Sequence, residues 1–199
     1  MRVYAFTGAM INVCGLVAAV IRAIKDAFAA FSGDPVDLGT GLFINSHTDL
    51  ALPDTLPISI TRTYRQSDSR SRPFGIGTNF DYGIFLQSTN QYTEADLVLP
   101  DSAKIHYVRI SAGTGWTDAV FEAQSSPTAF YKSKIAWNGD GWDLTLRDGT
   151  VYVFGANQPL QAIRDRYNNQ TTLTRTSGQG GNITQIPDRQ VDQALLWHR

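Results

Sequence analysis

The chain has 199 residues, which is enough for one domain of ordinary size with an additional segment. Apolar residues make up 42% of the chain, enough for a packed core, while 17 basic and 18 acidic residues give a formal net charge of −1. This balance lacks the basic surface of a dedicated nucleic-acid binder, so we expect no nucleic-acid partner. The single cysteine, Cys14, excludes a disulfide bond within the chain.

The first segment, residues 1–32, is predicted to contain a helix. Residues 3–21 carry no charge, and their number is close to the roughly 20 residues that span a bilayer. Apolar side chains then follow at the spacing of one helix face: Ile21, Ile24, Phe28 and Phe31. Three roles stay open, namely a cleavable signal peptide, a membrane-inserted helix, and a soluble helix packed on the β domain or on another chain. Three charged residues argue against the signal peptide: Arg22, Lys25 and Asp26.

From residue 33 onward the pattern is that of strands and turns. Apolar residues alternate with polar ones in residues 56–64 and 80–86, as in half-buried strands. Two hairpins are predicted, one around residues 100–103 and one around Asp148-Gly149, a favoured hairpin turn. Strands recur about every 8–12 residues, which favours an antiparallel all-β arrangement over a parallel α/β one. The predicted fold class is mainly β, with antiparallel hairpins and one N-terminal α-helix.

Residues 156–186 become repetitive. A turn at residues 165–169 is followed by a short β-prone run, and residues 181–186 resemble the start of a further copy. Strand–turn–strand units of this kind cannot bury a face alone and must stack, so an unfinished stack would leave an unpaired edge near residues 170–186. Residues 187–199 differ in composition from the repeats. We therefore predict four segments: an apolar helix in 1–32, a β-rich domain in 33–155, repeat units in 156–186 and an irregular tail in 187–199.

A set of short motifs occurs in a definite order along residues 33–186. The set includes Gly33-Asp34-Pro35-Val36-Asp37, Arg62-Thr63-Tyr64, Phe74-Gly75-Ile76-Gly77, Phe80-Asp81-Tyr82 and Arg147-Asp148-Gly149-Thr150. Together they resemble the start of bacterial Rhs proteins. The first part is similar to the domain that precedes the YD repeats of that family, and the turns at 165–169 and 181–186 are similar to YD-repeat turns. The resemblance implies that the hairpins lead into a YD-repeat β sheet.

The resemblance also implies a function. In Rhs proteins the YD repeats build a closed β shell around a C-terminal toxin, so the chain would be a non-catalytic structural part of a toxin delivery protein, an end plug or the start of the shell. The implied partners are the remaining shell and the toxin, with secretion machinery or a membrane as further partners. The localisation stays open, with the cell envelope or export through a secretion system favoured. Complete family members are far longer, so we expect a truncated or frame-shifted product, or a fragment.

We expect no enzyme activity and no catalytic, metal or cofactor site. The histidines are isolated in the sequence and give no zinc-binding spacing: His47, His106 and His198. No Gly-x-Ser-x-Gly motif occurs, and the glycine-rich residues 177–181 lack the Lys-Ser/Thr end of a phosphate loop. Three aspartates that could be imagined as paired carboxylates stand next to or near glycines, as turn residues do: Asp140, Asp143 and Asp148.

Aromatic residues supply the candidate binding site. Four of them could form a platform on which sugar rings stack: Trp116, Trp137, Trp142 and Tyr131. Aromatic residues in strands more often belong to the core. The alternative function is accordingly a carbohydrate or cell-surface binding module. A cluster of arginines near residues 67–71 is either a solvated loop or a contact with a neighbouring domain: Arg62, Arg65, Arg70 and Arg72.

Overall fold

The computed structural model describes residues 42–126, 128–156, 159–178 and 180–187. The chain divides into two compact units, Met1–Phe43 and Ile44–Arg199, and nearly all described residues belong to the second. The described residues form antiparallel sheets and no helix, which confirms the predicted mainly β fold class. The predicted N-terminal helix, the apolar residues 3–21 and the tail beyond residue 187 lie outside the described residues. Within the described part, no helix is long and apolar enough to cross a membrane.

A three-stranded antiparallel sheet opens the second unit. Its strands are β1 (Ile44–Leu52), β2 (Ile58–Arg65) and β5 (Thr78–Phe80), in the order β1-β2-β5. The short strands β3 (Ser71–Arg72) and β4 (Gly75–Ile76) form a ladder of their own in the loop between β2 and β5. Hydroxyl groups pair across β1 and β2, where the side-chain oxygens of Thr48 and Thr61 lie 3.0 Å apart. Cross-strand pairs of this kind stabilise a sheet and fix its register.

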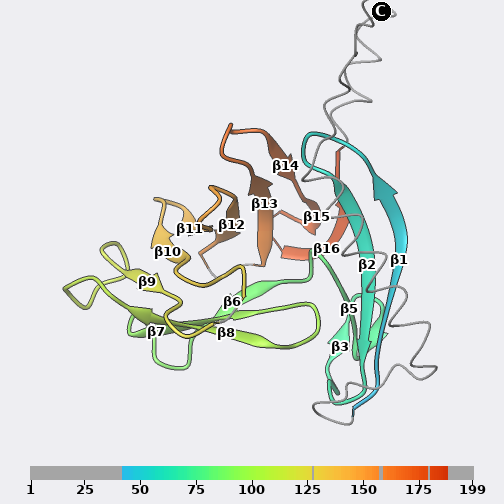
Figure 1. Ribbon diagram of the computed structural model, residues 1–199, viewed down its shortest axis with the longest axis horizontal. Coiled ribbons are helices and arrows are strands. Elements are labelled where there is room, and N and C mark those ends of the chain that lie inside the picture. Colours follow the sequence, from blue (N-terminus) through green and yellow to red (C-terminus); the bar gives the residue numbers. More distant parts are fainter. Residues whose placement is uncertain (1–41, 127, 157–158, 179, 188–199) are drawn as a thin grey trace, which may run out of the picture. The chain divides into compact units, whose positions relative to one another are not determined.

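The larger sheet contains nine strands that pair strictly in chain order (Figure 1). They are β6 (Phe85–Gln87), β7 (Glu94–Val98), β8 (Lys104–Arg109), β9 (Val120–Glu122), β10 (Lys134–Trp137), β11 (Gly141–Thr145), β12 (Val151–Gly155), β13 (Leu160–Arg164) and β14 (Gln170–Thr172). Every neighbouring pair within β6–β14 is antiparallel. A hairpin of β15 (Thr174–Ser177) and β16 (Gly180–Gln185) follows.

The nine-stranded sheet curls until its first strand returns to β13. Phe85 of β6 forms an antiparallel bridge with Pro159, and the Leu160 amide donates to the Ile84 carbonyl at 3.2 Å. The curl encloses a single cluster of buried apolar side chains drawn from strands along the whole sheet, including Leu97, Tyr107, Phe121, Ile135, Leu144, Phe154 and Leu160. This cluster is the main core of the second unit.

Both predicted hairpins are present. In the first, which joins β7 to β8, the Leu99 amide donates to the Ala103 carbonyl at 2.9 Å. In the second, which joins β11 to β12, the Leu146 amide donates to the Thr150 carbonyl at 2.8 Å. Gly149 in this second turn has a φ of +90°, a conformation that glycine adopts without steric penalty.

The predicted single strand over residues 80–86 was wrong. The chain leaves the three-stranded sheet after Phe80 and enters the nine-stranded sheet at Phe85. The intervening turn is closed by the Gly83 amide, which donates to the Phe80 carbonyl at 2.7 Å, and by Asn79 Nδ2, which donates to the Gly83 carbonyl. Tyr82 and its neighbours remain buried because this turn also packs on the core, so the apolar alternation continues where the strand does not.

The first predicted repeat turn, residues 165–169, joins β13 to β14. The Asp165 carboxylate accepts the backbone amides of Tyr167 and Asn169, at 2.8 and 2.9 Å, and Asn168 has a φ of +64°. Residues 181–186 fall largely in β16, which pairs back with β15. The nine-stranded sheet is continuous from β12 to β13, across the point where the sequence predicts the change from the β-rich domain to the repeats.

The predicted arginine cluster is held by partners within the chain. Asp68, whose side chain is 3% exposed, accepts hydrogen bonds from Nε of Arg70 and of Arg72, both at 2.9 Å. Arg65 donates to the Asp101 carbonyl at 2.7 Å, and Arg62 pairs with Asp49. The loop after β2 is therefore fixed to the β7–β8 turn by ion pairs and hydrogen bonds rather than being freely solvated.

Candidate functional site

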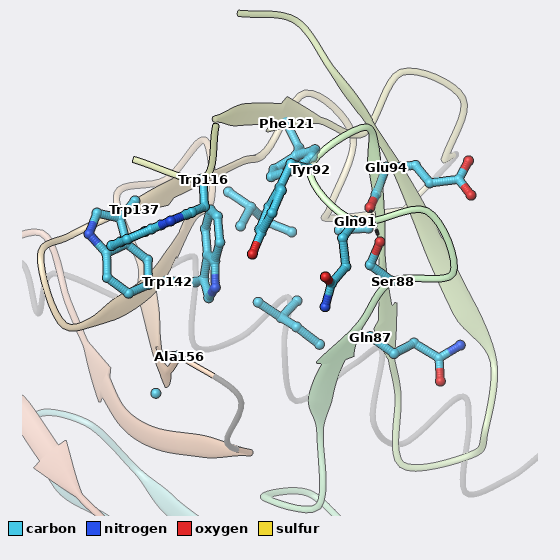
Figure 2. A pocket seen from close by; sticks show the side chains of 14 residues that line it. Gln87, Ser88, Gln91, Tyr92, Glu94, Trp116, Phe121, Trp137, Trp142 and Ala156 are labelled. Carbon is cyan, nitrogen blue, oxygen red and sulfur yellow. Dashed lines mark hydrogen bonds between the residues drawn. The ribbon is translucent and has the colours of Figure 1, made fainter. Parts of the chain in front are cut away.

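A cavity of about 370 Å³ lies where several turns of the nine-stranded sheet meet (Figure 2). In an antiparallel meander, alternate turns fall at the same end of the sheet, so the β6–β7, β8–β9, β10–β11 and β12–β13 connections come together there. We call this cavity the aromatic pocket. Its lining residues are Leu86, Gln87, Ser88, Gln91, Tyr92, Glu94, Ala95, Trp116, Phe121, Ile135, Trp137, Trp142, Gly155 and Ala156.

Three of the four predicted platform residues line this pocket. Trp116 comes from the β8–β9 loop, Trp137 ends β10, and Trp142 belongs to β11. Trp137 lies between the other two, with ring centroids 4.5 Å from Trp116 and 5.3 Å from Trp142, and both contacts are edge-to-face. Phe121 adds a further edge contact to Trp142 at 5.8 Å. Edge-to-face packing of this kind holds aromatic rings in defined orientations.

The fourth predicted residue, Tyr131, does not line the pocket. Its side chain is exposed, and the Lys132 ammonium lies 5.7 Å from the centre of its ring. Lys132 in turn donates to Glu122 at 2.8 Å. Tyr131 therefore belongs to a surface contact and gives the site a matched control position.

The opposite side of the pocket is formed by the β6–β7 turn, which the sequence analysis missed. Figure 2 shows the side chains of Gln91 and Tyr92 across the cavity from the tryptophans. Ser88 Oγ donates to the Glu94 carbonyl at 2.7 Å and closes the base of the turn. Tyr92 has a φ of +63°, a left-handed conformation that few residues other than glycine adopt. Only the fold reveals this side of the site, because residues 88–93 carry no regular pattern.

The pocket contains little charge. Glu94 supplies the only carboxyl group among the lining residues, and Figure 2 shows its side chain pointing away from the cavity. Its Oε1 accepts a hydrogen bond from Thr89 at 3.0 Å, and its Oε2 lies 3.8 Å from Nε2 of His106. Among the residues that the structure describes, no lysine or arginine lines the pocket.

Several of the polar residues considered in the sequence analysis have structural partners. Asp143 lies 3.1 Å from Arg164, and the Asp148 carboxylate accepts the Thr150 amide at 2.9 Å. His106 Nδ1 lies 2.9 Å from Asp96. In the described part of the chain, no group of three or more His, Cys, Asp or Glu residues gathers where it could hold a metal ion.

Comparison with known proteins shows which family the chain resembles. Residues 33–107 match a family described as a domain of unknown function (DUF6531), which is found in Rhs-type proteins. Two curated proteins of Dickeya dadantii (strain 3937), "Probable deoxyribonuclease RhsB" and "Probable deoxyribonuclease RhsA", are each 30% identical over 161 residues. The chain belongs to the Rhs family. The match covers 76% of this Rhs chain but 10% of each relative, so the chain spans about a tenth of their length.

The family match and the aromatic pocket overlap only in part. The DUF6531 match ends at residue 107, within β8. The β6–β7 turn of the pocket lies inside the match, whereas the three tryptophans lie beyond it. The pocket of this Rhs chain is therefore assembled from the matched domain and from the strands that follow it.

Proposed function

We propose that the chain is a non-catalytic structural part of an Rhs-type toxin delivery protein, forming an end plug or the start of its β shell. The observation that carries the proposal is the strictly sequential sheet β6–β14. Within the described residues, β14 pairs with β13 on one side and stands at the edge of that sheet. An edge strand presents backbone N–H and C=O groups to which a further strand pairs. The next strand along the chain, β15, pairs with β16 instead, so this edge stays open to a strand from elsewhere in the protein, as in a repeat shell.

The polar groups of the described residues support a structural role. Asp49, Asp68, Asp96, Asp118 and Asp143 all lie in ion pairs that connect strands or loops of the chain. General acid–base chemistry requires a carboxylate or imidazole within reach of a bound substrate. In the aromatic pocket the titratable side chains are those of Tyr92 and Glu94, and the second points outward.

Two experiments test the proposal. The purified chain, incubated with supercoiled plasmid DNA and Mg²⁺, is expected to leave the plasmid intact, and cleavage by the chain alone would contradict a non-catalytic role. In the second experiment, the region of Dickeya dadantii RhsB that matches this chain is deleted or replaced by it. We expect deletion to abolish folding of the full-length protein into a protease-resistant particle, and replacement to restore that particle. Formation of the particle without the region would contradict the structural role.

A second candidate function, carbohydrate or cell-surface binding, is favoured by one observation. Trp116, Trp137 and Trp142, selected from the sequence as sugar-stacking residues, come together around one cavity. Small-molecule sites are typically cavities of roughly 300–1,000 Å³ with apolar walls and a few polar groups, as this one is. Screening the purified chain against an immobilised glycan array tests this function, and uniform absence of binding would argue against it.

A further inference from the structure

We propose that the aromatic pocket binds one uncharged pyranose ring, with the tryptophans contacting its apolar face and Gln91 and Tyr92 contacting its hydroxyl groups. We further infer that Arg109 is the positioning residue that holds both sides of the pocket in place. The proposal rests on carbohydrate binding, the second candidate function. It adds the class of sugar and the residue that keeps the site formed.

The two unlike sides of the pocket match the two unlike parts of a sugar ring. A pyranose presents C–H groups on its face and hydroxyl groups around its rim. Aromatic rings pack against C–H groups, while an amide and a phenol both donate and accept hydrogen bonds. The tryptophans form the first kind of surface, and Gln91 and Tyr92 supply the second kind across the cavity (Figure 2).

The charge around the pocket selects an uncharged ring. An acidic sugar would lose water on entering and would find no lysine or arginine among the lining residues. A quaternary ammonium ion would need aromatic faces around it. Here aromatic rings lie on both sides, the indoles on one and Tyr92 on the other, but the single lining carboxylate, Glu94, is turned outward, so no negative charge faces the cavity (Figure 2). Neither type of charged ligand finds a group of opposite charge in this cavity.

Arg109, at the end of β8, joins the two loops that form the pocket. Its side chain is 8% exposed, and each of its five N–H groups has a partner in these loops. Nη1 donates to the carbonyls of Tyr92 at 2.9 Å and Gly115 at 2.7 Å. Nε and Nη2 donate to two further carbonyls of the β8–β9 loop at 3.2 and 2.9 Å, and Nη2 also lies 3.0 Å from Asp118. The residue after Gly115 is Trp116, so one guanidinium fixes backbone beside both walls.

Fixed loops raise affinity because the site is already formed when a ligand arrives. Ordering a loop on binding opposes association, and that loss is avoided when the loop is held in advance. The β6–β7 turn needs such support, since Tyr92 sits in the left-handed region at a φ of +63°. The hydrogen bond from Arg109 to the Tyr92 carbonyl holds the turn at this residue. A lysine at position 109 would keep the charge but would not reach all five partners.

The binding experiment uses the whole chain and a defined set of probes. Uncharged probes are methyl glucoside, methyl galactoside and N-acetylglucosamine; acidic probes are methyl glucuronide and sialic acid; the cationic probe is tetramethylammonium. Binding is followed by tryptophan fluorescence and by saturation-transfer NMR on the probe. We expect at least one uncharged probe to bind and to change the tryptophan emission, while the acidic and cationic probes do not bind.

Variants locate the site. Trp137→Ala and Gln91→Ala are expected to weaken binding by about tenfold or more, as removal of a central contact does. Tyr131→Ala is the matched control because its ring lies outside the pocket, and it is expected to bind as the unsubstituted chain does. Loss of binding in Tyr131→Ala together with full binding in Trp137→Ala would overturn the placement of the site.

Arg109 is tested by a pair of variants. Arg109→Lys is expected to weaken binding about fivefold to tenfold and to speed amide exchange in residues 88–93 and 110–119 while the melting temperature stays close to that of the original chain. Arg164→Lys, the same substitution at an arginine that pairs with Asp143 outside the pocket lining, is expected to change neither measurement. If Arg109→Lys unfolds the chain, the Thr89→Ala variant, which removes a hydrogen bond within the same turn and lies outside the pocket lining, provides the exchange and affinity comparison. Unchanged affinity in a folded variant with loosened loops would overturn the positioning role.

The outcomes separate this proposal from the function on which it rests. Binding of the acidic or cationic probes in preference to the uncharged ones would overturn the proposal. The pocket would then be a binding site for a charged class of ligand. Absence of binding by every sugar would overturn carbohydrate binding itself. Binding of an uncharged sugar that Trp137→Ala abolishes supports both.

Discussion

Replacing Asp68 by alanine removes the carboxylate that fixes the loop between β2 and β5 to the β7–β8 turn. Asp68 Oδ1 accepts from Arg70, and Oδ2 accepts from Arg72 Nε at 2.9 Å and from Ser102 Oγ at 2.5 Å. After the substitution, Arg72 keeps a long contact of 3.4 Å to Ser102 and its position near the Phe85 ring. The guanidinium is then left without its carboxylate partner in a largely buried position.

Burial decides the size of this effect. The Asp68 and Arg72 side chains are 3% and 10% exposed, whereas that of Arg70 is 49% exposed. Removing one partner of a buried ion pair costs roughly 3–5 kcal/mol, and an exposed pair contributes roughly 0–1 kcal/mol. We therefore expect Asp68→Ala to lower the free energy of unfolding by about 3 kcal/mol or more. Arg70→Ala, the matched control, is expected to lower it by about 1 kcal/mol or less.

The pH dependence provides an independent check. Burial by itself raises the pKa of Asp68, but hydrogen bonds from its hydroxyl and guanidinium partners outweigh burial and hold that pKa well below its usual range. A carboxylate with a lowered folded-state pKa stabilises the protein fully above its unfolded pKa of about 3.9 and progressively less as the pH falls below it. The difference between the original chain and Asp68→Ala should therefore be largest at neutral pH and should shrink in acid.

The assay is urea unfolding followed by tryptophan fluorescence, carried out at neutral pH and at about pH 3 for the original chain and both variants. A loss below about 1 kcal/mol at neutral pH for Asp68→Ala would refute the estimate based on burial. A difference that does not shrink at acidic pH would refute the assignment of the effect to the carboxylate charge.

Three further predictions concern the nine-stranded sheet. Leu144→Ala, at a position with 0% exposure, is expected to lower the free energy of unfolding by about 2–5 kcal/mol in urea titrations, and a loss below about 1 kcal/mol would contradict its core position. Burial raises the pKa of Tyr107 to about 12, so the tyrosinate absorbance of Tyr107 should appear only well above pH 10. The stabilisation that comes from keeping Tyr107 neutral is complete below the unfolded pKa of about 10 and should be lost as the pH rises toward 12. Tyr107→Phe, which removes a 2.7 Å contact to Ser133, should eliminate this late titration step. Gly149→Ala should lower the melting temperature more than Gly139→Ala does. Both glycines have a positive φ, but only at Gly149 would an added Cβ meet another residue, at 2.7 Å. Equal losses of melting temperature would show that the close contact relaxes freely.

The sequence predicts the strands best where a turn signal accompanies the apolar alternation. The Asp148-Gly149 pair predicts the β11–β12 hairpin, and the tetrad at 100–103 predicts the β7–β8 hairpin. Alternation alone was not enough at residues 80–86, because Tyr82 is buried in a turn between two sheets. β1 was also missed, since its residues are mostly exposed and show little apolar alternation. Such a strand is specified by its partner β2 rather than by its own pattern.

The site was predictable only in part, because the sequence pattern does not show which segments the fold brings together. Tryptophans are conspicuous in a sequence, and three of the four selected aromatics line one pocket. Tyr131 looked equivalent in the sequence, but its place in the turn before β10 directs it to the surface. Gln91 and Arg109 could not be selected, because their importance depends on which loops the sheet order brings together. Residue type identifies candidate side chains, whereas sheet order decides which of them meet.

The chain-order pairing of β6–β14 has a consequence for how the protein forms. Each strand finds its partner a short distance away along the chain, so pairing from β6 onward requires only small loops to close, and proteins dominated by such local contacts fold fast. On a ribosome, each new strand emerges next to the one already laid down. The Phe85–Pro159 bridge is different, because it joins residues far apart in sequence and is available only once β7–β12 exist. We therefore expect closure of the curl to be the last step when the sheet folds during synthesis, and a ribosome pause before residue 159 to leave the sheet open.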